Sequence, residues 1–374
     1  MSESWDVVIV GAGIVGSACA LECAGRGLRT AVVEGKGIAG GATAAGMGHI
    51  VVMDDSPAQM ALTCYSQTLW KGLSDRLPAN VEYETCGTLW VASDDEEMQE
   101  VRRKSALYAS ADIFTVILDS QMLAEAEPHL RQPLPGALLV PSDAVLYPPC
   151  AAAYLLGEAL RLGARLYSRK ALSAKAGNVR LDDGTKLHAA RIVNAGGAEA
   201  GELYSGLPMR KRKGHLVITD RYPGFVRHQL VELGYLKSAH SLTSDSVAFN
   251  VQPRKTGQVL IGSSRQYSTE DPTVDTQILT SMIERAQWYL PEIGALSAIR
   301  VWTGFRAATP DKLPLIGPSP EDESLFLATG HEGLGITTSL GTACMLADHL
   351  QGIETRIPIE PYLPARFAKG EVHA

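Results

Sequence analysis

Three glycines near the N-terminus, Gly11, Gly13 and Gly16, have the spacing G-x-G-x-x-G. In this pattern the first glycine permits a tight turn, the second lets a phosphate approach the backbone, and the third lets a helix pack closely on a strand. Glu34 follows roughly 20 residues later, where a carboxylate can bond a ribose hydroxyl. The residues therefore predict a dinucleotide site. The acid disfavours a 2′-phosphate, so NADP is the least expected ligand, and FAD and NAD both remain open.

The elements that must position these residues are also predicted. Residues 7–10 are a short apolar run, typical of a buried parallel strand, and 30–33 form a second one. Between them, 14–24 are expected to form a helix whose N-terminus favours anions. Strand, turn, helix, strand and terminal acid occur in order, which makes the motif far more specific than a lone glycine pattern.

The segment 35–49 is rich in glycine and alanine and ends at His49. Glycine and alanine have little or no side chain, so such a segment can lie close against something flat or bulky, such as a flavin ring or a pyrophosphate. The alternative is a flexible surface loop. Because the segment directly follows the predicted nucleotide-binding unit, we favour the first interpretation.

The composition excludes several classes of protein. The chain has 374 residues, 45% of them hydrophobic and 20% charged, which suggests two domains or one large one. A net charge of -7 argues against nucleic-acid binding. The uncharged run 7–21 is broken by glycines, is shorter than the ~20 residues of a membrane span and follows an acidic flank, so we expect no span and a cytoplasmic protein. Six scattered cysteines lack C-x-x-C spacing, so no metal site or disulfide framework is expected.

The rest of the chain predicts an α/β fold with interleaved domains. Helices are expected at 57–76, 96–109, 149–163, 273–290 and 336–350, and a short one after an N-cap at Asp119. Strands are expected at 83–93, 136–140, 144–147, 191–197, 216–219, 246–252, 258–263, 300–304 and 325–329, with a hairpin at 178–187. The nucleotide-binding pieces are placed at 1–80, 145–208 and 298–374, and a second, β-rich domain at 81–144 and 209–297.

Several further motifs resemble the FAD-dependent D-amino acid oxidase family, which includes glycine oxidase, sarcosine oxidase and D-amino acid dehydrogenases. Besides the N-terminal unit, they are residues 41–46, Glu127-Pro128, 193–196, Gly304-Phe305-Arg306 and 330–337. Within the family, stretches 250–258, 261–266 and 331–339 are most similar to the catalytic β subunits of heteromeric D-hydroxyproline dehydrogenases, to opine oxidases and to hydrogen cyanide synthase. The resemblance favours FAD over NAD and implies a Rossmann-like FAD-binding domain with a mainly antiparallel substrate domain.

The resemblance also implies site residues. Arg306 would hold the substrate carboxylate, for which a guanidinium offers two parallel donors, and His49 would lie near the flavin ring; the alternatives are a surface arginine and a structural histidine. Tyr235 and His331 are weaker candidates. The residues expected to contact FAD are Gly11, Gly13, Ile14, Gly16, Glu34, Gly35, Lys36, Gly41, Ala42, Thr43, Gly46, Met47, Gly48, Ala171, Ala195, Gly196, Gly333, Leu334, Gly335, Ile336 and Thr337.

The implied reaction is hydride transfer from the substrate Cα to flavin N5, which gives an imine and needs no metal. The leading hypothesis is a dehydrogenase for D-hydroxyproline or a similar cyclic amino acid, with a second subunit as electron acceptor. The alternatives are an oxygen-using glycine or sarcosine oxidase and a flavin-binding subunit without turnover. The basic cluster Arg210-Lys211-Arg212-Lys213 is expected to be a solvated surface, with a docking site for a partner or a second flavin as the alternative.

Overall fold

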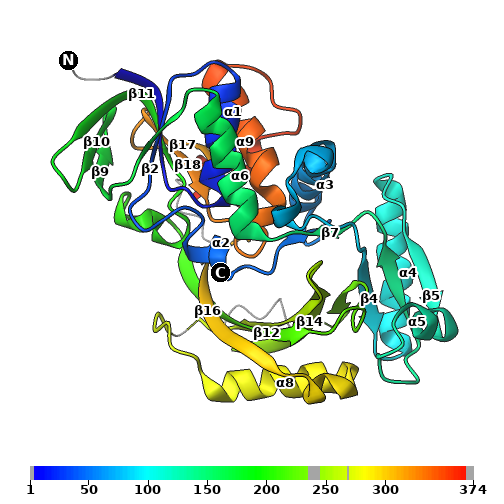
Figure 1. Ribbon diagram of the computed structural model, residues 1–374. Helices are drawn as coiled ribbons and strands as arrows, with labels where there is room; N and C mark the ends of the chain where they lie inside the picture. The colour runs from blue at the N-terminus through cyan, green and yellow to red at the C-terminus, as the bar shows by residue number, and fades with distance from the viewer. Residues whose placement is uncertain (1–3, 235–244, 268, 368–374) are drawn as a thin grey trace. The chain divides into compact units, whose positions relative to one another are not determined.

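The computed structural model describes residues 4–234, 245–267 and 269–367. The chain forms two compact units, each built from separate segments (Figure 1). The first unit comprises Met1–Val81, Tyr147–Lys211 and Phe305–Ala374. The second comprises Glu82–Leu146 and Arg212–Gly304.

The first unit is built on a sheet whose central strands are parallel, as expected for short, fully apolar runs. Its order is β17-β18-β11-β1-β2-β8, and β17 alone of these runs antiparallel to its neighbour. The strands are β1 (Ser4–Val10), β2 (Thr30–Val33), β8 (Arg165–Tyr167), β11 (Lys186–Asn194), β17 (Leu315–Pro318) and β18 (Leu325–Thr329). An antiparallel extension, β9 (Ala171–Lys175) and β10 (Asn178–Leu181), joins β11.

The helices of the first unit pack on one another through small residues. Helix α1 (Ile14–Gly25) packs against α6 (Pro148–Arg161) and α9 (Gly335–Gln351), and α3 (Pro57–Leu73) packs against α9, as Figure 1 shows. On α1, Ala18, Cys19, Ala20 and Cys23 are fully buried, which allows the close approach. The short elements are α2 (Gly41–Ala45) and β3 (His49–Ile50).

The second unit is an eight-stranded sheet with helices packed on it. Its order is β16-β12-β15-β14-β13-β4-β6-β5. β13 and β4 run parallel, whereas the neighbours from β12 to β13 and from β4 to β5 run antiparallel. The strands are β4 (Thr88–Ala92), β5 (Val116–Asp119), β6 (Gly136–Val140), β12 (Arg210–Arg221), β13 (Gln229–Glu232), β14 (Ser246–Pro253), β15 (Gln258–Arg265) and β16 (Ala298–Ala308), with the short β7 (Ala144–Val145). Helix α8 (Thr276–Tyr289) packs on β14 and β15, where Tyr289 stacks on Phe249 with ring centroids 4.3 Å apart. Helices α4 (Asp95–Ser110) and α5 (Ser120–Ala126) pack on β4, β5 and β6.

The predicted fold class is confirmed: the chain is mixed α/β, with a mainly antiparallel second sheet. The strands predicted at 30–33, 136–140 and 325–329 have the observed bounds. The N-cap is also confirmed, because the Asp119 carboxylate accepts a hydrogen bond of 2.8 Å from the Met122 N–H at the start of α5.

Other expectations were wrong in detail. The strand predicted at 83–93 begins only at Thr88, and the strand predicted at 216–219 begins already at Arg210. The basic cluster is therefore only partly a solvated surface: Arg210 is exposed, whereas Arg212 and Lys213 are 3% and 2% exposed. Inside the paired strand, Lys213 exchanges both backbone hydrogen bonds with Gln266, and the Arg212 guanidinium donates to the Tyr267 hydroxyl at 3.0 Å. Neighbouring residues of a strand point to opposite faces of the sheet, and both of these side chains are buried.

Two absences bear on function. Within residues 4–367, apart from the short gaps named above, no helix combines the length and apolar character that a membrane crossing requires. The same residues contain no group of three or more His, Cys, Asp or Glu side chains placed to hold a metal ion.

Candidate functional site

The candidate residues gather where the parallel strands of the first unit end. Val10, the last residue of β1, pairs with Val33 of β2 on one side and with Asn194 of β11 on the other. The residues that follow these strands are Gly11, Glu34 and Ala195. In open α/β sheets, ligands bind at the carboxyl ends of the strands, so the site lies where this class of fold places it.

The first and third glycines of the motif are required by backbone packing. Gly11 has φ of +109°, and a Cβ on it would lie 2.5 Å from the carbonyl oxygen of Ala195. A Cβ on Gly16 would lie 2.0 Å from the carbonyl oxygen of Gly11. Helix α1 therefore sits directly against the turn, which no other residue type allows.

The N-terminus of α1 is open to an anion. Its N-cap, Gly13, has no capping side chain, and its first turn contains no acidic residue. The Ile14 N–H donates to the Thr43 hydroxyl at 3.0 Å, and a Cβ on Gly13 would lie 3.2 Å from that same oxygen. The other first-turn N–H groups have no acceptor within the helix, which suits a phosphate.

Glu34 closes the turn from the end of β2. Its carboxylate accepts hydrogen bonds from the N–H of Ala12 at 2.8 Å, of Lys36 at 2.7 Å and of Gly37 at 3.2 Å. A carboxylate has about four acceptor positions, so one remains for a hydroxyl donor. The Lys36 ammonium pairs with Glu199 of the short helix Gly197–Glu202, which neutralises its charge locally.

Gly35 and Ala171 lie at the same end of the sheet. A Cβ on Gly35 would lie 2.8 Å from the Cα of Lys170, the residue before Ala171, and Ala171 itself is buried. Gly196 follows the end of β11, where its N–H donates to the side-chain oxygen of Asn194 at 3.1 Å. These contacts hold the backbone of the turns after β2 and β11 in place.

The segment 35–49 is not a plain loop, because residues 41–45 form α2. Thr43 is buried and bonded to Ile14, whereas Ala42 is exposed. After α2, Met47 is buried and Gly48 has φ of +108°. Sequence reasoning missed the helix because five residues give too short a periodic signal.

The N-terminus of α9 lies beside that of α1. A Cβ on Gly335 would lie 3.8 Å from Cγ2 of Val15, in the first turn of α1. A Cβ on Gly46 would lie 2.7 Å from Cδ1 of Ile336. Leu334 is the N-cap of α9 and provides no capping side chain, and the first turn is free of acidic residues. Two helix N-termini thus create positive potential at one place.

Thr337 and Trp70 hold the first turn of α9. The Thr337 hydroxyl donates to the carbonyl oxygen of His49 at 2.8 Å and accepts from the N–H of Val51 at 3.3 Å. The buried Trp70 indole N–H donates to the carbonyl oxygens of Ile336 and Thr337 at 3.2 and 3.1 Å. Sequence reasoning missed Trp70, whose only signal was a tryptophan on the apolar face of a helix.

Arg306 lies within β16, not after it as the sequence suggested. The strand ends against the loop before α9, since Ala308 bridges His331 and the Glu332 N–H donates to the Ala307 carbonyl at 2.8 Å. A Cβ on Gly333 would lie 3.8 Å from both Cδ and Nε of Arg306. The half-buried Arg306 side chain therefore lies alongside the glycine loop.

His49 is electrostatically coupled to Arg306. Burial, and secondly the positive charge of Arg306, lower the pKa of His49 to about 4. The imidazole is therefore neutral at physiological pH and can donate or accept a hydrogen bond without adding charge. His331 is different: burial lowers its pKa to about 3, and its Nε2 lies 3.0 Å from the Thr342 hydroxyl, which is a structural contact.

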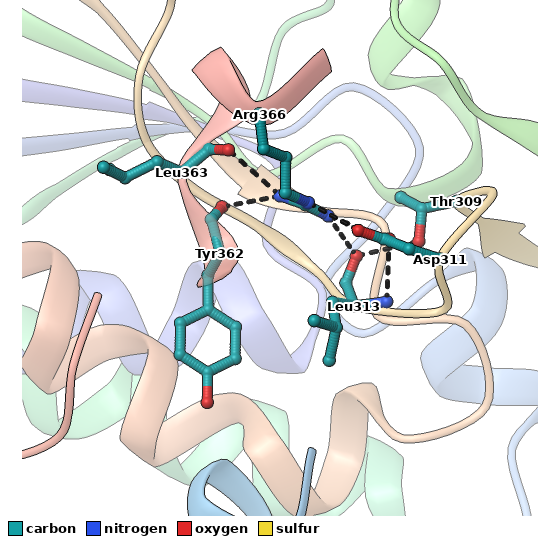
Figure 2. A network of polar contacts seen from close by, with 6 residues as sticks. All are labelled: Thr309, Asp311, Leu313, Tyr362, Leu363 and Arg366. Carbon is teal, nitrogen blue, oxygen red and sulfur yellow. Dashed lines mark hydrogen bonds and ion pairs between the residues drawn. The ribbon is translucent and has the colours of Figure 1, made fainter. Parts of the chain in front are cut away.

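A further arginine secures the connection after β16 (Figure 2). The Arg366 guanidinium binds the Asp311 carboxylate through Nε at 2.6 Å and Nη2 at 3.1 Å. It also donates to the carbonyl oxygens of Leu313 at 2.8 Å, Tyr362 at 2.9 Å and Leu363 at 3.2 Å. The C-terminal segment is thereby fastened to the strand end that follows Arg306. No sequence pattern indicated this link.

The predicted residues of the first unit thus surround the ends of β1, β2 and β11 and the first turns of α1 and α9. Arg306, His49 and Gly333 form a group at the first turn of α9. Tyr235 lies outside the described residues.

The fold and this site define a dinucleotide-binding oxidoreductase of the α/β class. The family model DAO, FAD dependent oxidoreductase, matches residues 6–349, and the chain belongs to that family. FAD is therefore its cofactor, and the glycine turn, Glu34 and the two open helix N-termini fit the ribose and phosphates of such a group.

Individual relatives cover the chain almost completely. It is 29% identical to hydrogen cyanide synthase subunit HcnC of Pseudomonas aeruginosa, over 98% of this chain and 97% of that one. It is 27% identical to glycine oxidase of Geobacillus kaustophilus, over 97% of each chain. The crystal structure of glycine oxidase from that organism superposes with a TM-score of 0.87 at 26% identity, covering 98% of this chain and 99% of the other. L-proline dehydrogenase from P. horikoshii, at 24% identity and a TM-score of 0.89, shares the fold.

Proposed function

We propose that this protein oxidises a small amino or imino acid with FAD, and that D-hydroxyproline or a similar cyclic amino acid is its substrate. The observation that supports the proposal is the position of Arg306, half-buried in a strand and alongside the glycine loop that opens α9. An arginine that binds one carboxylate here would select substrates that carry an α-carboxylate.

The chemistry of this group of residues is suited to orientation. A guanidinium can donate two parallel hydrogen bonds to a carboxylate and keeps its charge at any relevant pH. Two such bonds fix the direction of the substrate as well as its position. Because His49 is neutral, it adds no second positive charge that would draw the carboxylate away from Arg306.

FAD, when bound, supplies the oxidising power by accepting a hydride from the substrate Cα. The chain's own contribution is to hold the carboxylate at Arg306 and to provide positive potential from the first turns of α1 and α9. That positive potential would stabilise the negative charge that the flavin gains when it accepts the hydride. The intact Arg306 group argues against a flavin-binding subunit without turnover.

A second candidate function is an oxygen-using glycine or sarcosine oxidase. It is supported by the similarity to glycine oxidases over almost the whole chain. The two candidates differ in the substrate and in the electron acceptor. The similarity to a protein named as a hydrogen cyanide synthase subunit favours an acceptor in a second subunit, which we include in the proposal.

One experiment separates these functions. The purified flavoprotein is mixed anaerobically with D-hydroxyproline, D-proline, sarcosine or glycine, and flavin absorbance is followed. Bleaching by D-hydroxyproline with slow recovery in air supports the dehydrogenase. Bleaching by glycine or sarcosine with fast recovery supports the oxidase. If none of the four bleaches the flavin, the proposal is refuted.

A further inference from the structure

Two side chains of α3 bind the main chain of α9. The indole N–H of Trp70 donates to the carbonyl oxygens of Ile336 and Thr337 at 3.2 and 3.1 Å. The Ser66 hydroxyl oxygen accepts a hydrogen bond of 3.2 Å from the N–H of Gly341. Ser66 and Trp70 are four residues apart in α3, so they lie on one face of that helix, and both are fully buried. This face of α3 therefore holds α9 by polar contacts as well as by packing.

These contacts involve main-chain groups that a helix normally pairs internally. In an α-helix the carbonyl oxygen of one residue accepts from the N–H of the residue four positions later, and Thr337 and Gly341 are such a pair in α9. Trp70 binds the acceptor of this pair and Ser66 binds its donor. A side chain that enters the hydrogen-bond ladder is one of the causes of local helix bending. The position of the first two turns of α9 therefore depends on α3.

Gly341 permits this close approach. A Cβ on Gly341 would lie 2.3 Å from Oγ of Ser66 and 3.1 Å from Cδ1 of Leu62. A glycine inside a helix is less favourable than an alanine, but here it leaves room for the hydroxyl that binds its own N–H. The sequence of α9 is thus matched to the contact with Ser66.

The turn that α3 holds carries part of the candidate site. Thr337, whose carbonyl oxygen binds Trp70, also donates its hydroxyl hydrogen to the carbonyl oxygen of His49 at 2.8 Å. The loop before α9 lies alongside Arg306, because Gly333 faces that side chain. The N–H groups of the first turn have no capping side chain. A shift of this turn would therefore move the open helix N-terminus away from its place beside His49 and Arg306.

We infer that Ser66 and Trp70 are positioning residues that hold the positive end of α9 toward the bound flavin and so raise the reduction potential of the flavin. The inference rests on the proposed function in one step: a substrate held at Arg306 must meet the flavin, which brings the flavin ring to the loop that opens α9. A flavin that accepts a hydride gains negative charge. The positive end of a helix stabilises such a charge when the helix is fixed in place before the reaction.

The test is a reductive titration of the purified flavoprotein against a reference dye, which gives the midpoint potential of the flavin without any amino acid. Trp70→Phe keeps an aromatic ring but loses the N–H that holds α9. We expect this variant to have an equilibrium constant for flavin reduction about 10-fold lower, which lowers the midpoint potential by about 30 mV for a two-electron couple. Ser66→Ala, which loses one acceptor, should shift the potential in the same direction and by less.

Trp90→Phe is the matched control. Trp90 is a buried tryptophan of β4 in the second unit, and its indole N–H has no hydrogen-bond partner among the residues that the structure describes. The same substitution there removes the same side-chain atoms but no hydrogen bond, and should leave the midpoint potential unchanged. An equal shift in the control would show a general effect of lost packing and would overturn the inference.

Two other results would also overturn it. The first is a wild-type potential in both Trp70→Phe and Ser66→Ala. The second is loss of FAD from both variants while the control stays fully loaded, because the contact would then serve FAD retention and not the potential.

The inference and the proposed function fail in different ways, since the titration uses no substrate. If amino acids reduce the wild-type flavin but Trp70→Phe has an unchanged potential, the positioning role is refuted and the proposed function stands. If no amino acid reduces the flavin but Trp70→Phe shifts its potential, the proposed function is refuted and the positioning role stands on the titration alone.

Discussion

Replacement of Gly16 by alanine tests how closely α1 must approach the glycine turn. In an open helix interior, Gly→Ala stabilises by about 0.5–1 kcal/mol because alanine loses less backbone entropy on folding. At Gly16, however, the new Cβ would lie 2.0 Å from the Gly11 carbonyl oxygen, against about 3.4 Å for an ordinary contact, so α1 must retreat by about 3.4 − 2.0 = 1.4 Å. Overpacking of this kind costs about 1–3 kcal/mol and more where the obstacle is backbone, so we expect a net loss of roughly 3 kcal/mol.

The assay is urea unfolding together with the FAD content of the purified protein. Gly157→Ala is the matched control, because Gly157 lies inside α6 and a Cβ there would meet nothing within 4 Å. We expect the control to be as stable as the wild type or up to about 1 kcal/mol more stable, with full FAD. A Gly16→Ala protein with wild-type stability and full FAD content would refute the packing argument.

Two further predictions concern stability. Arg366→Met removes the bidentate pair with Asp311 and three hydrogen bonds to carbonyl oxygens, and should lower the free energy of unfolding in urea by about 2–4 kcal/mol. The control Arg356→Met, at an exposed arginine, should lower it by less than about 0.5 kcal/mol. Equal effects of the two substitutions would contradict the structural role of the contacts drawn in Figure 2. Burial lowers the pKa of His331 from 6.5 to about 3, so the unfolded chain binds a proton that the folded chain excludes, and stability should fall as pH drops from about 6.5 toward 3. Between pH 7 and 5 the wild type should lose about 2 kcal/mol more than His331→Gln, and parallel curves for the two proteins would show that His331 is not held neutral.

Local patterns predicted the elements that depend on neighbouring residues. The glycine motif, the apolar runs of β1 and β2 and the N-cap Asp119 are all short-range signals, and the structure has each of them.

The features that the sequence did not reveal depend on distant contacts. Two hydrogen bonds join segments that are far apart in the chain. They run from the Ile14 N–H to the Thr43 hydroxyl and from the Trp70 indole N–H to the Ile336 carbonyl oxygen in α9. The charge of Arg212 and Lys213 predicts exposure when the sequence is read locally. Both are buried because their strand pairs with a distant part of the chain, at Gln266.

The central claim is that Arg306 holds the substrate carboxylate, and anaerobic single-turnover reduction of the Arg306→Ala flavoprotein tests it most directly. The variant should keep the bound-flavin spectrum but be reduced at least about 100-fold more slowly by the best amino or imino acid substrate, since a charged bidentate contact is lost. Arg300→Ala, at an exposed arginine of the same strand, should be reduced at the wild-type rate. Reduction of Arg306→Ala at the wild-type rate would contradict the assignment.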